Sequence, residues 1–107
     1  MGPNHDSTDQ VVCLTIVAEA VLTQRLLADL QGAGARGWTL TRAEGSGPRG
    51  RRVSESEGGN VRIEVLAPTD VTDRVWTALH ERYFPHYAVI AWQHTVDVSR
   101  PDLFGAS

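Results

Sequence analysis

Lysine is absent from this chain, cysteine occurs once, and no stretch is apolar for the length of a membrane span. Without lysine, a phosphate loop ending in Lys-Ser or Lys-Thr is excluded, and all ten basic residues are arginines, whose planar forks can bind an anion with two hydrogen bonds. The lone Cys13 excludes a disulfide within the chain, and its apolar neighbours predict a buried, reduced thiol. Because the N-terminal residues also lack the pattern of a signal peptide, we expect a soluble, cytoplasmic protein.

Charge and length narrow the class of protein further. A net charge of -3 gives no reason to expect binding to nucleic acid, and the Arg49-Gly-Arg-Arg cluster is weak evidence for it. The 107 residues are enough for one domain with one core. Residues 1–10 are polar and aperiodic, which predicts a disordered tail, so we place the domain at residues 11–104 and a short tail at 105–107.

Hydrophobic periodicity predicts six elements in the order β-α-β-β-α-β. Strands are expected at residues 11–17, 38–42, 61–67 and 87–97, where β-branched, aromatic or alternating apolar residues gather. A first helix is expected over residues 19–31, ended by Gly32 and Gly34, and a second from an N-cap at Asp70 to about Tyr83 and Phe84. This order is that of a ferredoxin-like α+β sandwich, with two helices on one face of a four-stranded sheet.

The second face of that sheet has no predicted cover. The first and fourth strands are apolar on both sides, yet two helices can bury only one face. Self-association is the simplest way to bury the other face, so we predict a closed homo-oligomer with ligand clefts between subunits. Trp38, Trp76 and Trp92 fit core or interface anchors better than cofactor platforms.

A polar connection at about residues 44–60 joins the second and third strands and is long for a hairpin loop. Gly45 and Gly47 allow a ligand to approach the backbone closely, and Arg49, Arg51 and Arg52 suit phosphate or carboxylate oxygens. An anion site and a solvated, flexible hairpin tip both explain this composition.

Two other kinds of site were weighed. His80, His86 and His94 lack the spacing of a metal motif, although His94 and Cys13 would make a soft pair if adjacent strands placed them together. No serine or cysteine has a recognisable His-Asp partner, so we predict no catalytic residues and no metal site.

Several segments together resemble the PII-like signalling proteins, in particular the branch associated with carboxysomes and bicarbonate transport. The resemblance covers about nine-tenths of the domain and is carried by four motifs: Gly32-x-Gly34-x-x-Gly37-Trp-Thr, Gly45-x-Gly47-x-Arg49-x-x-Arg52, Asn60-Val-Arg-Ile-Glu-Val-Leu66 and Tyr83-Phe84-x-x-Tyr87. It implies a ferredoxin-like homotrimer, a T-loop at about residues 44–60, and adenine nucleotides bound in the clefts between subunits. The residues implied in nucleotide binding are Gly45, Ser46, Gly47, Arg49, Arg52, Tyr87, Ala88, Val89 and Ile90.

The chain also departs from the nitrogen-sensing PII proteins. It lacks their Gly-Asp-Gly-Lys loop after the second helix and their Arg-Thr-Gly-Glu stretch after the last strand. Fewer cationic groups favour AMP, ADP or cyclic AMP, and Arg49, Arg51 and Arg52 are candidates for binding bicarbonate. The resemblance implies a non-catalytic regulator of inorganic-carbon uptake or carboxysome function, with a membrane transporter or a carboxysome protein as partner. The alternatives are a CutA-like metal-tolerance protein and a small nucleotide-hydrolysing enzyme on the same fold.

Overall fold

The computed structural model of this chain describes residues 10–44 and 59–105. Four strands and two α-helices follow one another in the predicted order, with the short 3-10 helices η2 (Ala20–Leu22) and η4 (Pro101–Phe104) added. The principal elements are β1 (Val11–Glu19), α1 (Thr23–Ala33), β2 (Trp38–Ala43), β3 (Asn60–Ala67), α2 (Thr69–Arg82) and β4 (Ile90–Val96).

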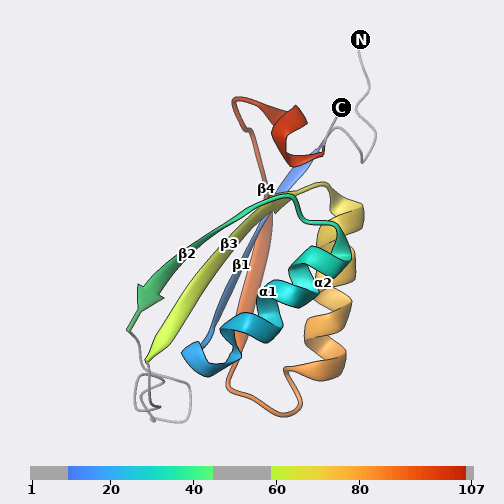
Figure 1. The fold of residues 1–107 in the computed structure, drawn as a ribbon. Helices are drawn as coiled ribbons and strands as arrows, with labels where there is room; N and C mark the ends of the chain where they lie inside the picture. Colours follow the sequence, from blue (N-terminus) through green and yellow to red (C-terminus); the bar gives the residue numbers. More distant parts are fainter. Residues whose placement is uncertain (1–9, 45–58, 106–107) are drawn as a thin grey trace.

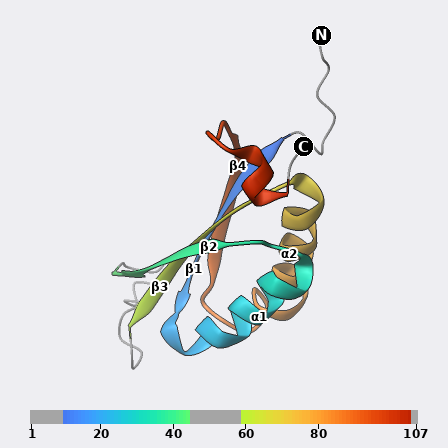
Figure 2. The same ribbon diagram turned by 45° about the horizontal axis from the view of Figure 1, so that its top comes forward.

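The strands form one antiparallel sheet in the order β2-β3-β1-β4, which places β2 and β4 at its two edges. Both helices lie on the same face of this sheet (Figures 1 and 2). The molecule is therefore the ferredoxin-type α+β sandwich that the sequence predicts.

The core lies between that face and the helices, and strand register explains which side chains enter it. Leu14 is aligned with Val65 and Ile16 with Ile63, and all four side chains are fully buried. Because side chains alternate along β1 and β3, every second side chain points toward the helices. These side chains pack against the leucines on one face of α1. The helical side of the core consists chiefly of Leu22, Leu26, Leu30, Val71, Val75 and Leu79.

No helix among the described residues covers the opposite face of the sheet, and we call it the open face (Figures 1 and 2). Ile90 and Trp92 of β4 remain 50% and 43% exposed there, and they are aligned with Val17 and Thr15 of β1. The prediction that β4 is apolar on both sides is wrong, because the register turns Ala91, Gln93 and Thr95 to the helix side. The apolar side chains of β4 therefore gather on the open face.

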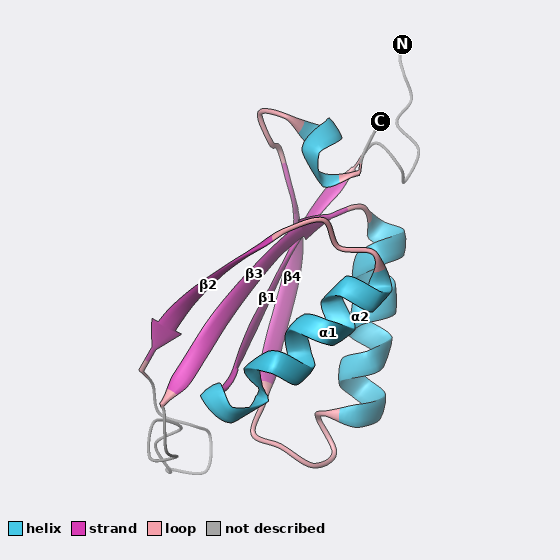
Figure 3. Ribbon diagram, in the orientation of Figure 1, coloured by secondary structure: helices cyan, strands magenta, loops and turns pink. Residues whose placement is uncertain are grey.

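Several predicted boundaries also need correction. Gly32 lies inside α1, and only Gly34, in the left-handed region at φ 102°, ends the helix. Pro68 is the residue that precedes α2, so Asp70 lies in the first turn and is not the N-cap. Residues 87–89 belong to the connection between α2 and β4 rather than to a strand (Figure 3). Pro85 explains this last difference, because it keeps the chain from passing directly from helix to sheet.

Candidate functional site

The residues predicted from the sequence to bind a ligand lie in two segments. The first segment is the connection between β2 and β3. Gly45, Ser46, Gly47, Arg49, Arg51 and Arg52 lie outside the described residues, but the base of this connection is described. A surface hollow of about 320 Å³ opens at this base, between Arg42, Ala43 and Glu44 on one strand and Gly59 and Asn60 on the other. The hollow therefore lies at the base of the connection whose composition suits either an anion site or a solvated hairpin tip.

Contacts at this base hold Gly59, the residue before β3, and an additional arginine lies at the hollow. The carbonyl of Gly59 accepts a hydrogen bond of 2.8 Å from the amide of Ala20, so the base is tied to the end of β1. Gly59 has φ 71°, and a Cβ atom there would lie 3.3 Å from Nη2 of Arg42. Sequence reasoning missed Arg42, because it treated this residue only as the end of a strand.

The second segment is the connection between α2 and β4, which contains Tyr87, Ala88, Val89 and Ile90. Its backbone is compact, because the carbonyl of Tyr83 accepts the amides of His86 and Tyr87 at 3.0 and 2.9 Å, and the amide of Val89 bonds to the carbonyl of Tyr87. Val89 is buried, whereas Ala88 and Ile90 are exposed. Of these four residues, therefore, the exposed pair offers surface to a ligand and Val89 anchors the segment.

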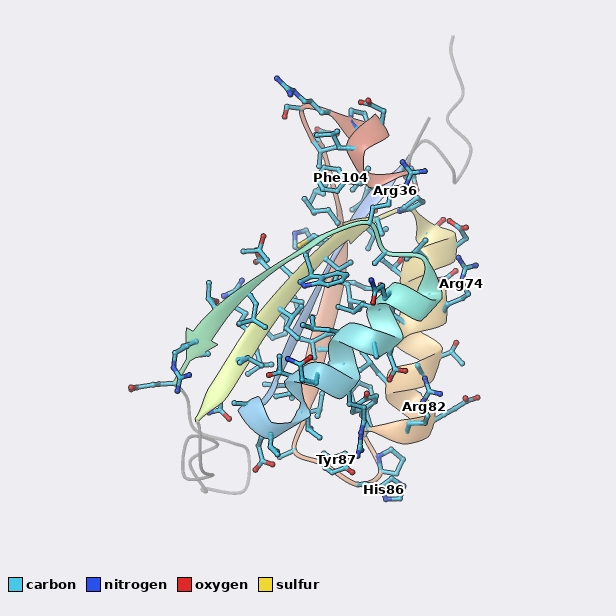
Figure 4. All side chains as sticks on the ribbon, in the orientation of Figure 1. Arg36, Arg74, Arg82, His86, Tyr87 and Phe104 are labelled. Carbon is cyan, nitrogen blue, oxygen red and sulfur yellow. The ribbon has the colours of Figure 1, made fainter. Side chains whose placement is uncertain are left out.

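A polar network joins this second segment to α1. The hydroxyl of the fully buried Tyr83 donates to Oδ2 of Asp29 at 2.5 Å, and Nη2 of Arg82 lies 3.0 Å from Oδ1 of the same carboxylate. Nη1 of Arg25 donates to the hydroxyl of Tyr87 at 2.8 Å. Figure 4 shows Arg82, His86 and Tyr87 grouped at the end of the molecule where α2 ends. Sequence reasoning also missed Arg25 and Asp29, because it placed them among the polar residues of an amphipathic helix.

Two pKa shifts report on this network. Burial, and then the hydrogen bond to Asp29, raise the pKa of Tyr83 well above its usual value, so the phenol stays neutral and donates its proton to the carboxylate. The hydrogen bond to Tyr87 raises the pKa of Arg25, whose guanidinium is a cation at physiological pH with or without this contact.

The two candidate segments lie at the same end of the sheet but at different edges. Ala43, Asn60 and Glu19 share one row across β2, β3 and β1, and Ile90 starts β4 opposite Val17, two residues before Glu19. Because β1 and β3 lie between β4 and β2, the segments are about 10 to 14 Å apart at ordinary strand spacing. Within the described residues, the hollow at the base of the first segment is lined by no residue of the second segment.

The three described histidines, His80, His86 and His94, belong to no cluster that could hold a metal ion. His80 is in an aromatic group with Trp76 and Phe84, with ring centroids 5.6 and 4.8 Å away. His94 is aligned with Cys13 across β4 and β1, so adjacent strands do place these two residues together. Within residues 10–44 and 59–105, no three His, Cys, Asp or Glu side chains are arranged to hold a metal ion.

A four-stranded antiparallel sheet with both helices on one face and candidate ligand segments at one end places this molecule among the ferredoxin-like α+β proteins. The sequence model of the family described as nitrogen regulatory protein P-II matches residues 11–103. The chain belongs to this P-II family, whose members are in general non-catalytic signalling proteins.

Solved structures agree with this assignment. A PII-like protein of Thermus thermophilus is 39% identical over 89% of this chain and 95% of its own, with a TM-score of 0.76. CPII of Thiomonas intermedia, solved with ADP and bicarbonate, is 19% identical over 89% and 94% of the two chains, with a TM-score of 0.78. B. subtilis GlnK, solved as its ATP complex, is 16% identical over 86% and 85%, with a TM-score of 0.62. At these lower identities the last two show a shared fold.

No curated protein matches the chain. The described helices are all too short or too polar to cross a membrane.

Proposed function

We propose that this chain is a non-catalytic PII-like sensor whose homotrimer binds an adenine nucleotide in the clefts between its subunits. One observation carries the proposal: the described bases of the two candidate segments lie at the same end of the sheet but on different strands, β2 and β3 for one segment and β4 for the other. In a closed ring of identical subunits, the β2 edge of one subunit can meet the β4 edge of the next. A complete site then forms at each subunit boundary.

The chemistry of the two halves supports a nucleotide as the ligand. Arg49 and Arg52 supply charged forks for phosphate oxygens, Gly45, Ser46 and Gly47 allow backbone amides to approach, and Arg42 borders the hollow at the base. The exposed Ala88 and Ile90 offer an apolar surface to a base or ribose. CPII, a protein of the same fold, was solved with ADP, AMP and bicarbonate. A ligand with few phosphates suits a site that has no lysine.

The signal would pass through the connection between β2 and β3, which the family resemblance identifies as a T-loop. An anion held by Arg49 and Arg52 favours one loop conformation over the others by its differential affinity for them. Bicarbonate is the second proposed ligand, because a small planar anion fits an arginine fork such as Arg51. The partner that reads the loop is proposed to be a bicarbonate transporter or a carboxysome protein, which would make this chain a regulator of inorganic-carbon uptake.

A thermal-shift panel tests the proposal. The chain is heated with ATP, ADP, AMP or cyclic AMP, with and without bicarbonate, since a ligand selective for the native state raises the unfolding temperature. The double variant Arg49→Ala/Arg52→Ala is expected to weaken binding by about 1.5–3 kcal/mol per lost charged hydrogen bond, or roughly 10- to 150-fold in Kd for each, measured by calorimetry.

Arg100→Ala is the matched control, because this exposed arginine follows β4 at the opposite end of the sheet and should leave binding unchanged. Unchanged affinity in the double variant would remove the proposed roles of both arginines. Product formed in proportion to added protein would identify an enzyme instead.

A further inference from the structure

Two polar contacts attach the connection between α2 and β4 to α1, and the residues that make them are equally spaced on both segments. Arg25 and Asp29 lie four residues apart and so share one face of α1. Their partners, Tyr87 and Tyr83, are also four residues apart, with Asp29 bound to Tyr83 and Arg25 to Tyr87. The two contacts therefore form an antiparallel brace between the helix and the connection.

The inner contact of the brace, between Asp29 and Tyr83, is buried enough to stabilise the fold. Tyr83 is fully buried, its hydroxyl is 2.5 Å from Asp29, and Arg82 completes the hydrogen bonding of the carboxylate. Loss of either partner would leave a polar group unsatisfied in or near the core, which destabilises the fold. This contact holds the end of α2 whether or not a ligand is present.

The outer contact, between Arg25 and Tyr87, lies at the surface, where it contributes little to the free energy of folding. Arg25 is exposed, and its guanidinium carbon lies 5.8 Å from the centroid of the half-buried Tyr87 ring in addition to its hydrogen bond to the hydroxyl. Exposed contacts of this kind add little to the free energy of unfolding. They can nevertheless fix the orientation of a ring, because the guanidinium bonds its hydroxyl and lies near its face.

Tyr87 is also the first residue of the segment proposed to line the nucleotide cleft. Its amide is bonded to the carbonyl of Tyr83 and its carbonyl to the amide of Val89, so its backbone sets the path of the chain toward Ile90. We infer that Arg25 is a positioning residue for nucleotide binding, which holds Tyr87 and through it the path of residues 87–90. This inference rests on the proposed function, since it names a residue that positions part of that same site.

Calorimetric titration of three variants tests the inference, with the nucleotide among ATP, ADP, AMP and cyclic AMP that stabilises the wild-type chain most. Arg25→Ala and Tyr87→Phe each remove one side of the outer contact, and Tyr87→Phe keeps the ring. Each is expected to raise Kd about 3- to 10-fold, and the double variant no further than the larger single effect, because both remove the same contact. Arg25→Lys keeps one donor and is expected to recover part of the affinity, and the unfolding temperature of each variant should stay within a few degrees of wild type.

Four outcomes would overturn the inference, and they separate it from the proposed function. Unchanged Kd in both single variants, with a wild-type chain that binds, rejects Arg25 as a positioning residue and leaves the proposed function standing. Losses that multiply in the double variant mean that Arg25 and Tyr87 contact the nucleotide independently. A large fall in unfolding temperature assigns them a structural role, and a wild-type chain that binds none of the four nucleotides removes the proposed function and this inference together.

Discussion

At the scale of single residues, several polar side chains of this molecule bond backbone or side-chain partners that lie far away in the sequence. Arg74 donates through both Nε and Nη2 to the carbonyl of Ala33, at 3.0 and 2.8 Å, although 41 residues separate them. That carbonyl lies at the end of α1, where helical partners are missing, so one arginine of α2 satisfies a group of α1. The Tyr83 hydroxyl acts in the same way on Asp29, across 54 residues.

The raised pKa of Tyr83 predicts how stability depends on pH. In the unfolded chain a tyrosine ionises near pH 10, whereas the folded chain keeps this phenol protonated. The stabilisation is therefore fully present below pH 10 and is lost above it, with a slope of up to about 1.4 kcal/mol per pH unit from this group. Tyr83→Phe is expected to be about 1 kcal/mol less stable at pH 8, because Asp29 loses a donor, and to lack this slope.

Urea unfolding at several pH values between 8 and 11 measures both effects. The difference in unfolding free energy between wild type and Tyr83→Phe should narrow as the pH rises above 10. Tyr87→Phe is the control, because its hydroxyl belongs to an exposed contact. Parallel plots of unfolding free energy against pH for wild type and Tyr83→Phe would contradict this role of Tyr83.

At the scale of an element, the end of α1 depends on one backbone conformation. The amide of Gly34 bonds to the carbonyl of Gln31, and that of Ala35 to the carbonyl of Leu30, which is the hydrogen-bond pattern of a Schellman motif. The motif needs a residue in the left-handed region, and Gly34 has φ 102°. Leu30 and Ala35 are both buried beside it, so the turn also directs the chain back toward the sheet.

Two glycines in this element should respond oppositely to substitution by alanine. Gly34→Ala places a Cβ on a left-handed residue and is expected to lower the free energy of unfolding by about 1–2 kcal/mol. Gly32→Ala lies inside the helix, where an added Cβ would meet nothing within 4 Å, and is expected to raise it by about 0.5–1 kcal/mol. Chemical denaturation compares them, and a shift of the same sign in both would refute the role given to Gly34.

At the scale of the whole molecule, the open face of the sheet exposes large side chains that no described helix covers (Figure 2). Trp92 is 43% exposed there, with the guanidinium carbon of Arg62 5.8 Å from its ring centroid, and Arg62 also pairs with Glu64 at 2.8 Å. Thr15 is fully buried between Glu64 and Trp92, although no helix covers it. Apolar and paired charged groups on one flat face suit burial against identical faces.

The proposed trimer predicts that charge on this face prevents assembly. The double variant Ile90→Arg/Trp92→Arg adds two cations that would be buried without partners at the interface, which opposes association by several kcal/mol. Light scattering on a size-exclusion column is expected to give the mass of one 11.7 kDa chain for this variant and of three for wild type. Val21→Arg, at an exposed position outside the sheet, should still assemble, and a wild-type monomer would reject the trimer.

The order of elements follows from the sequence alone, because it depends on interactions between near neighbours. Alternation along residues 61–67 defines one face of β3, and leucines at every fourth position define one face of α1. These periods are local, and they predicted the sheet and both helices correctly. Boundaries were less well predicted, as at the end of α1, where Gly32 stays in the helix and Gly34 adopts the left-handed conformation that ends it.

The amino-acid sequence by itself determined the order of elements and the fold class, because both depend on residue type and short spacing, and its resemblance to the PII-like proteins indicated the family. Only the tertiary structure decided which polar residues support the candidate site. Arg25 meets Tyr87 across 62 residues, and Arg42 lies at a hollow whose other wall begins at Gly59. No local pattern records such pairs, since the contact of one side chain with another is set by how helices and strands pack.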